Sequence, residues 1–283
     1  MFRDRHDAIM YESYFGLKEP PFNITPDPRY IFFSKKHLEA FSSLLYGIET
    51  RKGFIAITGE IGAGKTTLCR VLLEELKGRA KTSMILNPNL SGIELLAAIV
   101  QDFGVPVPSR NKKKCFDGLN QFLLEEFDRG YNVVLIIDEA QDLQPKSLEQ
   151  VRLLSNLETA SHKLLQIVLV GQPELRSILK SPSLTQLRQR ISVWYHLTNL
   201  DQKEMVQYIA HRLKVAGWSH DVSYLLDDAA LETIYDRTGG VPRLINILCD
   251  RAMLGAYGRG RQNIEASLVD ESSTEIEGIA VAS

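Results

Sequence analysis

Residues 54–68 read FIAITGEIGAGKTTL, and their pattern is the strongest indication of the fold in the sequence. The apolar and β-branched residues at 54–58 are typical of a buried strand, a glycine-rich segment follows, and the residues after it favour a helix. The eight residues from Gly59 to Thr66 match the pattern G-x-x-x-x-G-K-[ST], whose glycines let a backbone loop approach a phosphate group closely. Because both flanks are also correct, the stretch predicts a phosphate-binding loop.

Each residue type in this loop has a physical role in binding a nucleoside triphosphate. Consecutive backbone N–H groups and the positive end of the following helix attract phosphate oxygens. Lys65 is expected to contact the β- and γ-phosphates, and the Thr66 hydroxyl is expected to hold Mg²⁺. We therefore predict that ATP and Mg²⁺ bind at Gly59, Glu60, Ile61, Gly62, Ala63, Gly64, Lys65, Thr66 and Thr67.

A second apolar run, VVLIIDEAQ at 133–141, ends in two acids. Ligands of open α/β sheets bind at the carboxyl ends of the strands, so the acids are expected beside the phosphate loop. Asp138 suits the Mg²⁺ site, and Glu139 suits a general base that polarises the attacking water. The guanine-reading motif N-K-x-D does not occur in the sequence, so the acid pair favours an ATPase that converts ATP and water to ADP and phosphate. A solvated strand end is the structural alternative.

Short apolar runs alternate with helix-like segments over most of the chain. This alternation predicts an α/β fold: the parallel sheet of a P-loop NTPase with helices on both faces. From Asp201 onward only helical patterns occur, which predicts a small all-helical lid domain. The predicted strands are 54–58, 82–87, 132–138, 164–171 and 192–197, and the predicted domains are 1–199 (with an N-terminal arm rich in proline and aromatic residues), 200–270 (the lid) and 271–283 (a flexible tail).

Composition limits the class of partner and the cell compartment. The net charge of −2 over 283 residues gives no global basic field that would attract nucleic acid. Cys69, Cys115 and Cys249 lie far apart and match no zinc or redox spacing. The sequence contains no run of about 18 apolar residues, which is the length that a transmembrane helix needs. Its N-terminus also lacks the apolar core of a signal peptide. We therefore expect a cytoplasmic protein.

One local run of charge stands out against this balance. The segment SRNKKKC at 109–115 has four positive charges in what the pattern predicts to be a loop. Such a run is usually solvated, and nucleic acid or an anionic lipid is the alternative contact.

Six segments of the chain together carry a resemblance to a known family. They are FGLKEPPFNITPDPRYIF, GEIGAGKTTL, LIIDEAQDL, LVGQPEL, LRQRI and GGVPRLIN. Together they resemble the AAA+ ATPases of the ExeA (GspA) family, which is associated with type II secretion. Similar ATPases occur beside exosortase loci, and transposition regulators of the TniB/TnsC kind are more distant relatives. The resemblance covers about residues 10–270.

The resemblance implies roles for four further residues. Gln172 in LVGQPEL occupies the place of sensor 1, which orients the attacking water or contacts the γ-phosphate, although many AAA+ proteins have Asn or Thr there. Arg188 or Arg190 in LRQRI occupies the place of an arginine finger, with Arg190 preferred. Arg243 in GGVPRLIN occupies the place of sensor 2. The implied catalytic set is Lys65, Glu139, Gln172 and Arg190, with Thr66 and Asp138 on Mg²⁺.

The N-terminal arm has two interpretations. By resemblance, the segment around Phe22, Ile24, Pro26 and Tyr30 lines an adenine pocket. Plain hydrophobic packing of its aromatic side chains is the alternative.

Three functions remain open on the sequence alone. The first is an oligomeric ATPase that powers or regulates assembly of a secretion or envelope apparatus. It would act at the inner membrane through a partner or through an extension beyond Ser283. The second is an ATP-dependent, DNA-binding regulator of transposition. The third is an ATP-binding scaffold with negligible hydrolysis.

Overall fold

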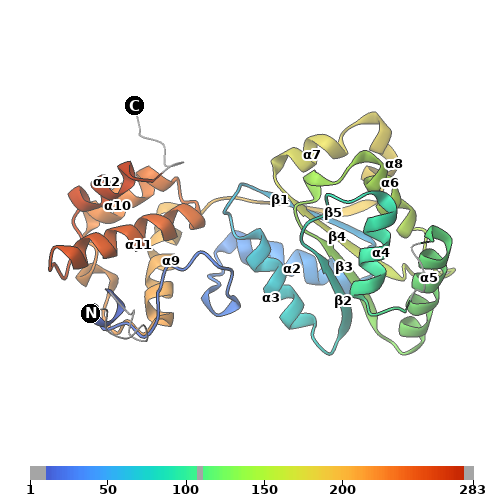
Figure 1. The fold of residues 1–283 in the computed structure, drawn as a ribbon, viewed down its shortest axis with the longest axis horizontal. Coiled ribbons are helices and arrows are strands. Elements are labelled where there is room, and N and C mark those ends of the chain that lie inside the picture. Colours follow the sequence, from blue (N-terminus) through green and yellow to red (C-terminus); the bar gives the residue numbers. More distant parts are fainter. Residues whose placement is uncertain (1–10, 107–110, 277–283) are drawn as a thin grey trace, which may run out of the picture. The chain divides into compact units, whose positions relative to one another are not determined.

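The computed structural model describes residues 11–106 and 111–276, which divide into two compact units (Figure 1). The α/β unit contains Lys35–Ile61 and Lys65–Thr198. The helical unit contains the described residues up to Ser34, the short loop segment Gly62–Gly64, and the described residues from Asn199 onward.

The α/β unit is built on a five-stranded sheet in which every paired strand runs parallel to its neighbour, in the order β2-β3-β4-β1-β5. All residues of β1 and β4 are buried, as expected for central strands covered on both faces, whereas β5 alternates buried and exposed positions at the sheet edge. The expected α/β fold is confirmed. The strands are β1 (Phe54–Gly59), β2 (Ala80–Ile85), β3 (Asn132–Ile137), β4 (Leu165–Gly171) and β5 (Ile191–Leu197).

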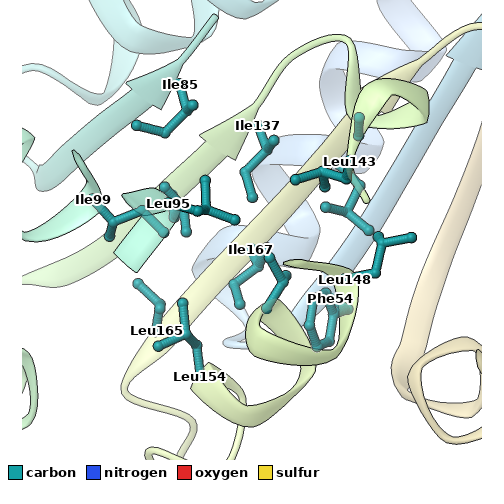
Figure 2. Close-up of a cluster of buried hydrophobic side chains, with 14 of the residues drawn as sticks. Phe54, Ile85, Leu95, Ile99, Ile137, Leu143, Leu148, Leu154, Leu165 and Ile167 are labelled. Atoms are coloured by element: carbon teal, nitrogen blue, oxygen red, sulfur yellow. The ribbon is translucent and has the colours of Figure 1, made fainter. Parts of the chain in front are cut away.

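Helices cover both faces of this sheet. Alternate strand residues point to opposite faces, and Phe54, Ile137 and Ile167 face the same apolar core as Leu95 and Leu148 from the covering helices (Figure 2). On that face lie α4 (Gly92–Asp102), α5 (Lys112–Asp128), α6 (Pro145–Leu154), α7 (Pro173–Leu179) and α8 (Thr185–Arg190). Two further helices pack against the strands, α2 (Lys35–Glu49) and α3 (Lys65–Leu76). Two single 3-10 turns lie between longer elements: η2 (Ala140–Asp142) between β3 and α6, and η3 (Pro182–Leu184) between α7 and α8.

The helical unit has an apolar core of its own, to which the N-terminal arm contributes. Phe15, Phe22 and Tyr30 of the arm are buried with Met205 and Ile245. The elements of this unit are α1 (Tyr11–Tyr14), η1 (Pro28–Tyr30), α9 (Gln202–Val215), η4 (Val222–Tyr224), α10 (Asp228–Thr238), α11 (Pro242–Gly258) and α12 (Ala266–Thr274).

A buried arginine fastens the arm to the helical unit. The Arg212 guanidinium donates to the backbone carbonyls of Pro21 (2.6 Å) and Asn23 (2.9 Å), and it lies 4.7 Å from the centre of the Tyr30 ring. The sequence-based boundaries attach the arm to the α/β domain, but these contacts group it with the helical unit. A sequence pattern cannot reveal this grouping, because all five strands lie between the arm and α9 along the chain.

Several predicted element boundaries differ from the structure; the strand predicted at 82–87, for example, is β2 at Ala80–Ile85. The pattern predicts a loop at 109–115, of which residues 109 and 110 lie outside the described residues. In the structure α5 begins at Lys112, because the Asn111 side chain accepts hydrogen bonds from the backbone N–H groups of Lys113 (3.0 Å) and Lys114 (3.2 Å). The expected flexible tail from 271 is helical through Thr274 in α12, and residues 277–283 of that predicted tail lie outside the described residues.

Candidate nucleotide-binding site

The glycine loop has the shape that its sequence predicts. It leaves β1 at Gly59 and enters α3 at Lys65. A Cβ atom on Gly59 would lie 2.6 Å from the carbonyl oxygen of Leu197, so only glycine fits there. Gly62 (φ 80°) and Gly64 (φ 92°) adopt left-handed backbone conformations that other residues rarely adopt.

Lys65 is buried and its ammonium group lies against its own loop. Its Nζ donates to the carbonyl oxygens of Gly59 (2.7 Å) and Glu60 (2.9 Å). Burial lowers the pKa of Lys65, and the nearby carboxylates of Glu139 and Asp138 oppose that shift. The lysine therefore places a desolvated positive group inside the loop, where an incoming phosphate could replace the two carbonyls.

Thr66 and Asp138 meet between α3 and the carboxyl end of β3. The Thr66 hydroxyl donates to Asp138 Oδ2 at 2.6 Å, and the Asp138 backbone N–H donates to the Ile85 carbonyl at 2.9 Å. Asp138 is only 2% exposed, and this burial raises the pKa of its carboxyl while the Thr66 bond opposes the rise. The two residues predicted for Mg²⁺ are therefore brought together.

The chemistry of this pair fits magnesium. Mg²⁺ prefers oxygen ligands in an octahedron at about 2.1 Å, in which adjacent ligand oxygens lie about 3 Å apart. Thr66 and Asp138 offer two oxygens at nearly that separation. Within 11–106 and 111–276, no group of three or more His, Cys, Asp or Glu side chains could hold a metal ion alone. A cation here would therefore complete its shell with water and phosphate oxygens, as Mg²⁺ commonly does.

Glu139 has an unusual backbone conformation. Its φ of 50° and ψ of 41° lie in the left-handed region, which costs a residue other than glycine about 1–3 kcal/mol and is concentrated at functional sites. The Glu139 N–H donates to Asp138 Oδ1 at 2.9 Å, which holds the bend in place. The two carboxylates at the end of β3 have different partners: Asp138 Oδ2 accepts from Thr66, and Glu139 Oε2 accepts from Gln141.

Gln141 is a residue of this site that the sequence analysis missed. Its amide nitrogen donates to Glu139 Oε2 (2.7 Å), and its amide oxygen accepts the backbone N–H of Gln172 (3.0 Å). The Gln172 side chain donates to the same Glu139 oxygen at 3.3 Å, so two amides hold one carboxylate oxygen. A Cβ on Gly171 would lie 2.7 Å from Gln141 Oε1, so glycine leaves room for this contact. The sequence signal that could have indicated Gln141 is its position two residues after Glu139, the predicted general base.

Arg190 lies at the amino ends of the strands, whereas the phosphate loop lies at their carboxyl ends. It ends α8, and the next residue, Ile191, pairs with Phe54 at the first position of β1, whereas the phosphate loop follows the last position. The six residues of β1 span roughly 17–20 Å, and this length separates the two ends of the sheet. The Arg190 guanidinium donates to Ser155 and to Asn156 Oδ1 (2.6 Å). Arg188 is exposed, and no hydrogen bond or ion pair to another described residue is found for it.

The remaining predicted residues belong to the helical unit. Arg243 is exposed in the first turn of α11, where Pro242 is the first helical residue. Of the arm residues considered for an adenine pocket, Phe22 and Tyr30 are buried in the core of the helical unit and Ile24 is 56% exposed. The packing interpretation therefore holds for the two aromatic residues.

The phosphate loop, the acid pair and the parallel sheet define a P-loop nucleotide-binding domain of the AAA class. Residues 48–179 match the family model described as an AAA domain. Over 271 residues, 95% of this chain, the sequence is 44% identical to General secretion pathway protein A of Aeromonas hydrophila. The chain therefore belongs with the AAA+ proteins related to that protein, and the resemblance seen in the sequence is confirmed. The chain spans 49% of that relative's length.

Solved structures support the fold independently. ORC2 of Aeropyrum pernix superposes with a TM-score of 0.70 at 18% identity, covering 93% of this chain and 73% of that one. Cdc6p of Pyrobaculum aerophilum gives 0.69 at 20% identity (92% and 72%), and the Thermotoga maritima RuvB branch migration motor gives 0.57 at 20% identity (86% and 69%). At these identities the likeness shows a common fold. Among the described residues, no helix is both long and apolar enough to cross a membrane.

Proposed function

We propose that this chain is a Mg²⁺-dependent ATPase that works as an oligomer. The observation that carries the proposal is the meeting of Lys65, Thr66, Asp138 and Glu139 at the carboxyl ends of β1 and β3. The AAA domain match and the P-loop fold support nucleotide binding in general.

Each residue of this cluster has a distinct task in hydrolysis. Lys65 Nζ exchanges the Gly59 and Glu60 carbonyls for β- and γ-phosphate oxygens. Thr66 and Asp138 hold Mg²⁺, which when bound neutralises charge on the phosphates. Glu139 accepts a proton from the attacking water through the carboxylate oxygen that the amides leave free. Gln141 and Gln172 orient that carboxylate through its other oxygen, Oε2.

An arginine from a second copy completes the site. Arg190 and Arg188 lie a strand length away from the phosphate loop of their own subunit, so neither reaches that subunit's γ-phosphate across the sheet. An arginine supplied in trans stabilises negative charge in the transition state. This arrangement requires self-association into a ring or filament, and it makes turnover depend on assembly.

The biological task we propose is to power or regulate assembly of a secretion or envelope apparatus. Support comes from the 44% identity to a protein named for the general secretion pathway. The chain would act in the cytoplasm, and would reach the inner membrane through a partner protein. Arg243 of the helical unit is assigned to the γ-phosphate by resemblance to AAA+ proteins.

The test of hydrolysis is a Glu139→Gln variant. It should bind ATP as the wild-type chain does but turn over at least roughly tenfold more slowly, because a general base typically contributes about 100- to 10,000-fold. Glu174→Gln, which changes an exposed glutamate at the start of α7, is the matched control and should turn over normally. Equal turnover of Glu139→Gln and Glu174→Gln would remove Glu139 from the role of base. Absence of turnover in the wild-type oligomer would favour the scaffold, and ATP-dependent, salt-sensitive DNA binding would favour the transposition regulator.

A further inference from the structure

A cavity of about 440 Å³ lies on the α/β unit, away from the phosphate loop. It is lined by Lys112, Lys113, Phe116 and Asp117 of α5, and by Gln150, Leu153 and Asn156 in and just after α6. This volume is in the range of pockets that hold small ligands or single anchoring side chains. None of the tasks proposed above for the phosphate loop uses it.

Gln150 gives the first indication of what the cavity binds. The residue is only 4% exposed, and its amide nitrogen has no hydrogen-bond acceptor among the described residues. A buried polar group without a partner costs about 1–3 kcal/mol, so an unpaired amide in the wall of a cavity points to a ligand that supplies the missing partner. The occupant must therefore carry a hydrogen-bonding group into the cavity.

The lysines at the start of α5 give the second indication. Lys112, Lys113 and Lys114 are all exposed in the first helical turn, where the positive end of the helix dipole disfavours cations. Asp117 is the single carboxylate on the cavity wall, so the rim keeps an excess of positive charge. The rim is therefore complementary to an anionic occupant.

The apolar part of the wall gives the third indication. Phe116 and Leu153 are half-buried and border the cavity together with the aliphatic stems of the lysines. Asn156 adds an exposed amide at the rim, and its Oδ1 accepts the hydrogen bond from Arg190. The occupant must combine an apolar group, negative charge and backbone-like hydrogen bonding.

We propose that this cavity is a docking site for an acidic peptide segment of a partner protein. One apolar side chain of the segment lies between Phe116 and Leu153, its carboxylates lie near Lys112 and Lys113, and a backbone carbonyl pairs with the Gln150 amide. A nucleic acid backbone would satisfy the lysines, and its phosphate oxygens could accept from the Gln150 amide, but it would leave the apolar wall unused. A lipid acyl chain would fill the apolar wall but leave Gln150 unpaired. This inference does not depend on ATP hydrolysis.

The experiment measures binding of defined probes to the full chain. The main probe is a fluorescent hexapeptide with a Leu-Phe pair flanked on each side by two glutamates. One control peptide replaces the glutamates with lysines, and a second replaces the Leu-Phe pair with Ser-Gly. Vesicles containing phosphatidylglycerol and a random-sequence DNA duplex are tested in parallel. We expect the acidic apolar peptide to bind with a dissociation constant tighter than about 1 mM, and each control peptide at least about tenfold more weakly.

Charge reversal tests the site without disturbing the fold. Lys112→Glu/Lys113→Glu should weaken the main probe at least about tenfold, while acids at a helix N-terminus leave α5 intact or stabilise it. Lys35→Glu/Lys36→Glu is the matched control, because it makes the same change in the first turn of α2, and it should bind normally. Gln150→Leu should weaken binding without lowering the melting temperature, since it removes an unpaired polar group.

Three results would overturn the proposal. The first is equal loss of binding in the two charge-reversed variants. The second is equal affinity of the main probe and the Ser-Gly peptide. The third is binding of vesicles or DNA that requires Lys112 and Lys113 while no peptide binds.

Discussion

The Thr66 hydroxyl donates a 2.6 Å hydrogen bond to Asp138 Oδ2, so the first turn of α3 is joined to the carboxyl end of β3. Asp138 is nearly inaccessible to solvent, and this bond compensates part of the cost of burying its carboxyl group. The pair therefore has two consequences: it stabilises the free protein, and it brings together two oxygens that suit Mg²⁺.

Thr66→Ala should show both consequences. Loss of the donor leaves Asp138 buried with one fewer partner, and the free energy of unfolding should fall by about 1–3 kcal/mol in the absence of nucleotide. Mg²⁺ should also lose most of its ability to tighten ATP binding, which titrations with and without Mg²⁺ would measure. Ser177→Ala removes an exposed hydroxyl of α7 that makes no bond to Asp138, and it should retain both properties. Full Mg²⁺ dependence in Thr66→Ala would contradict the proposed ligand.

Gln141→Ala should slow hydrolysis without weakening nucleotide binding. Gln141 holds both the Glu139 carboxylate and the Gln172 backbone, so its loss should misorient the base and lower turnover roughly tenfold. Gln144→Ala is the matched control, because Gln144 is an exposed amide whose side chain makes no capping bond to α6. Steady-state turnover and ATP affinity separate the two effects. Equal turnover in Gln141→Ala and Gln144→Ala would mean that Gln172 alone orients Glu139.

His211 should make the helical unit less stable as the pH falls. Desolvation and the nearby positive charges of Arg212 and Lys214 lower the pKa of His211, although a hydrogen bond with the backbone of Ile31 opposes them. The unfolded chain therefore binds a proton first as the pH drops below the ordinary histidine value of about 6.5. The contribution of His211 to stability is complete above that pH and is lost as the pH falls through the lower pKa of the folded state.

Fluorescence of one tryptophan can follow this transition. The chain has two tryptophans, so a Trp194→Phe background leaves Trp218 as the sole reporter of the helical unit. Between about pH 7.5 and pH 5, the unfolding midpoint should fall less in His211→Gln than in its parent. His220→Gln changes an exposed histidine of the same unit whose ring lies 5.3 Å from that of Trp218, so its fluorescence intensity will differ, but its unfolding midpoint should follow the parent. Parallel curves for parent and His211→Gln would contradict the assignment.

The sequence predicts those features that local patterns determine. The phosphate loop from Gly59 to Thr66 and the acid strand ending at Asp138 are each continuous in sequence, and strand alternation with helices implies a parallel sheet. The Gln141 contacts could not be predicted, because they depend on the parallel pairing that places the end of β3 beside the end of β4. The packing of the N-terminal arm against the helical unit could not be predicted either. Arg212 lies 189 residues from Asn23, and the burial of Arg212 follows from tertiary packing.

Mixing two inactive variants should show which arginine acts across a subunit boundary. Lys65→Ala removes the phosphate contact but keeps the arginine, and Arg190→Ala does the opposite, so a mixed oligomer contains some interfaces in which both are intact. If Arg190 acts in trans, the mixture should recover part of the turnover that each variant lacks alone. The same mixture with Arg188→Ala tests the exposed neighbour, because Arg190 is already held by Ser155 and Asn156 in its own subunit. Recovery with Arg188→Ala, and normal turnover of Arg190→Ala alone, would move the role to Arg188. No recovery in either mixture, with mass measurements showing intact assemblies, would contradict an arginine supplied in trans.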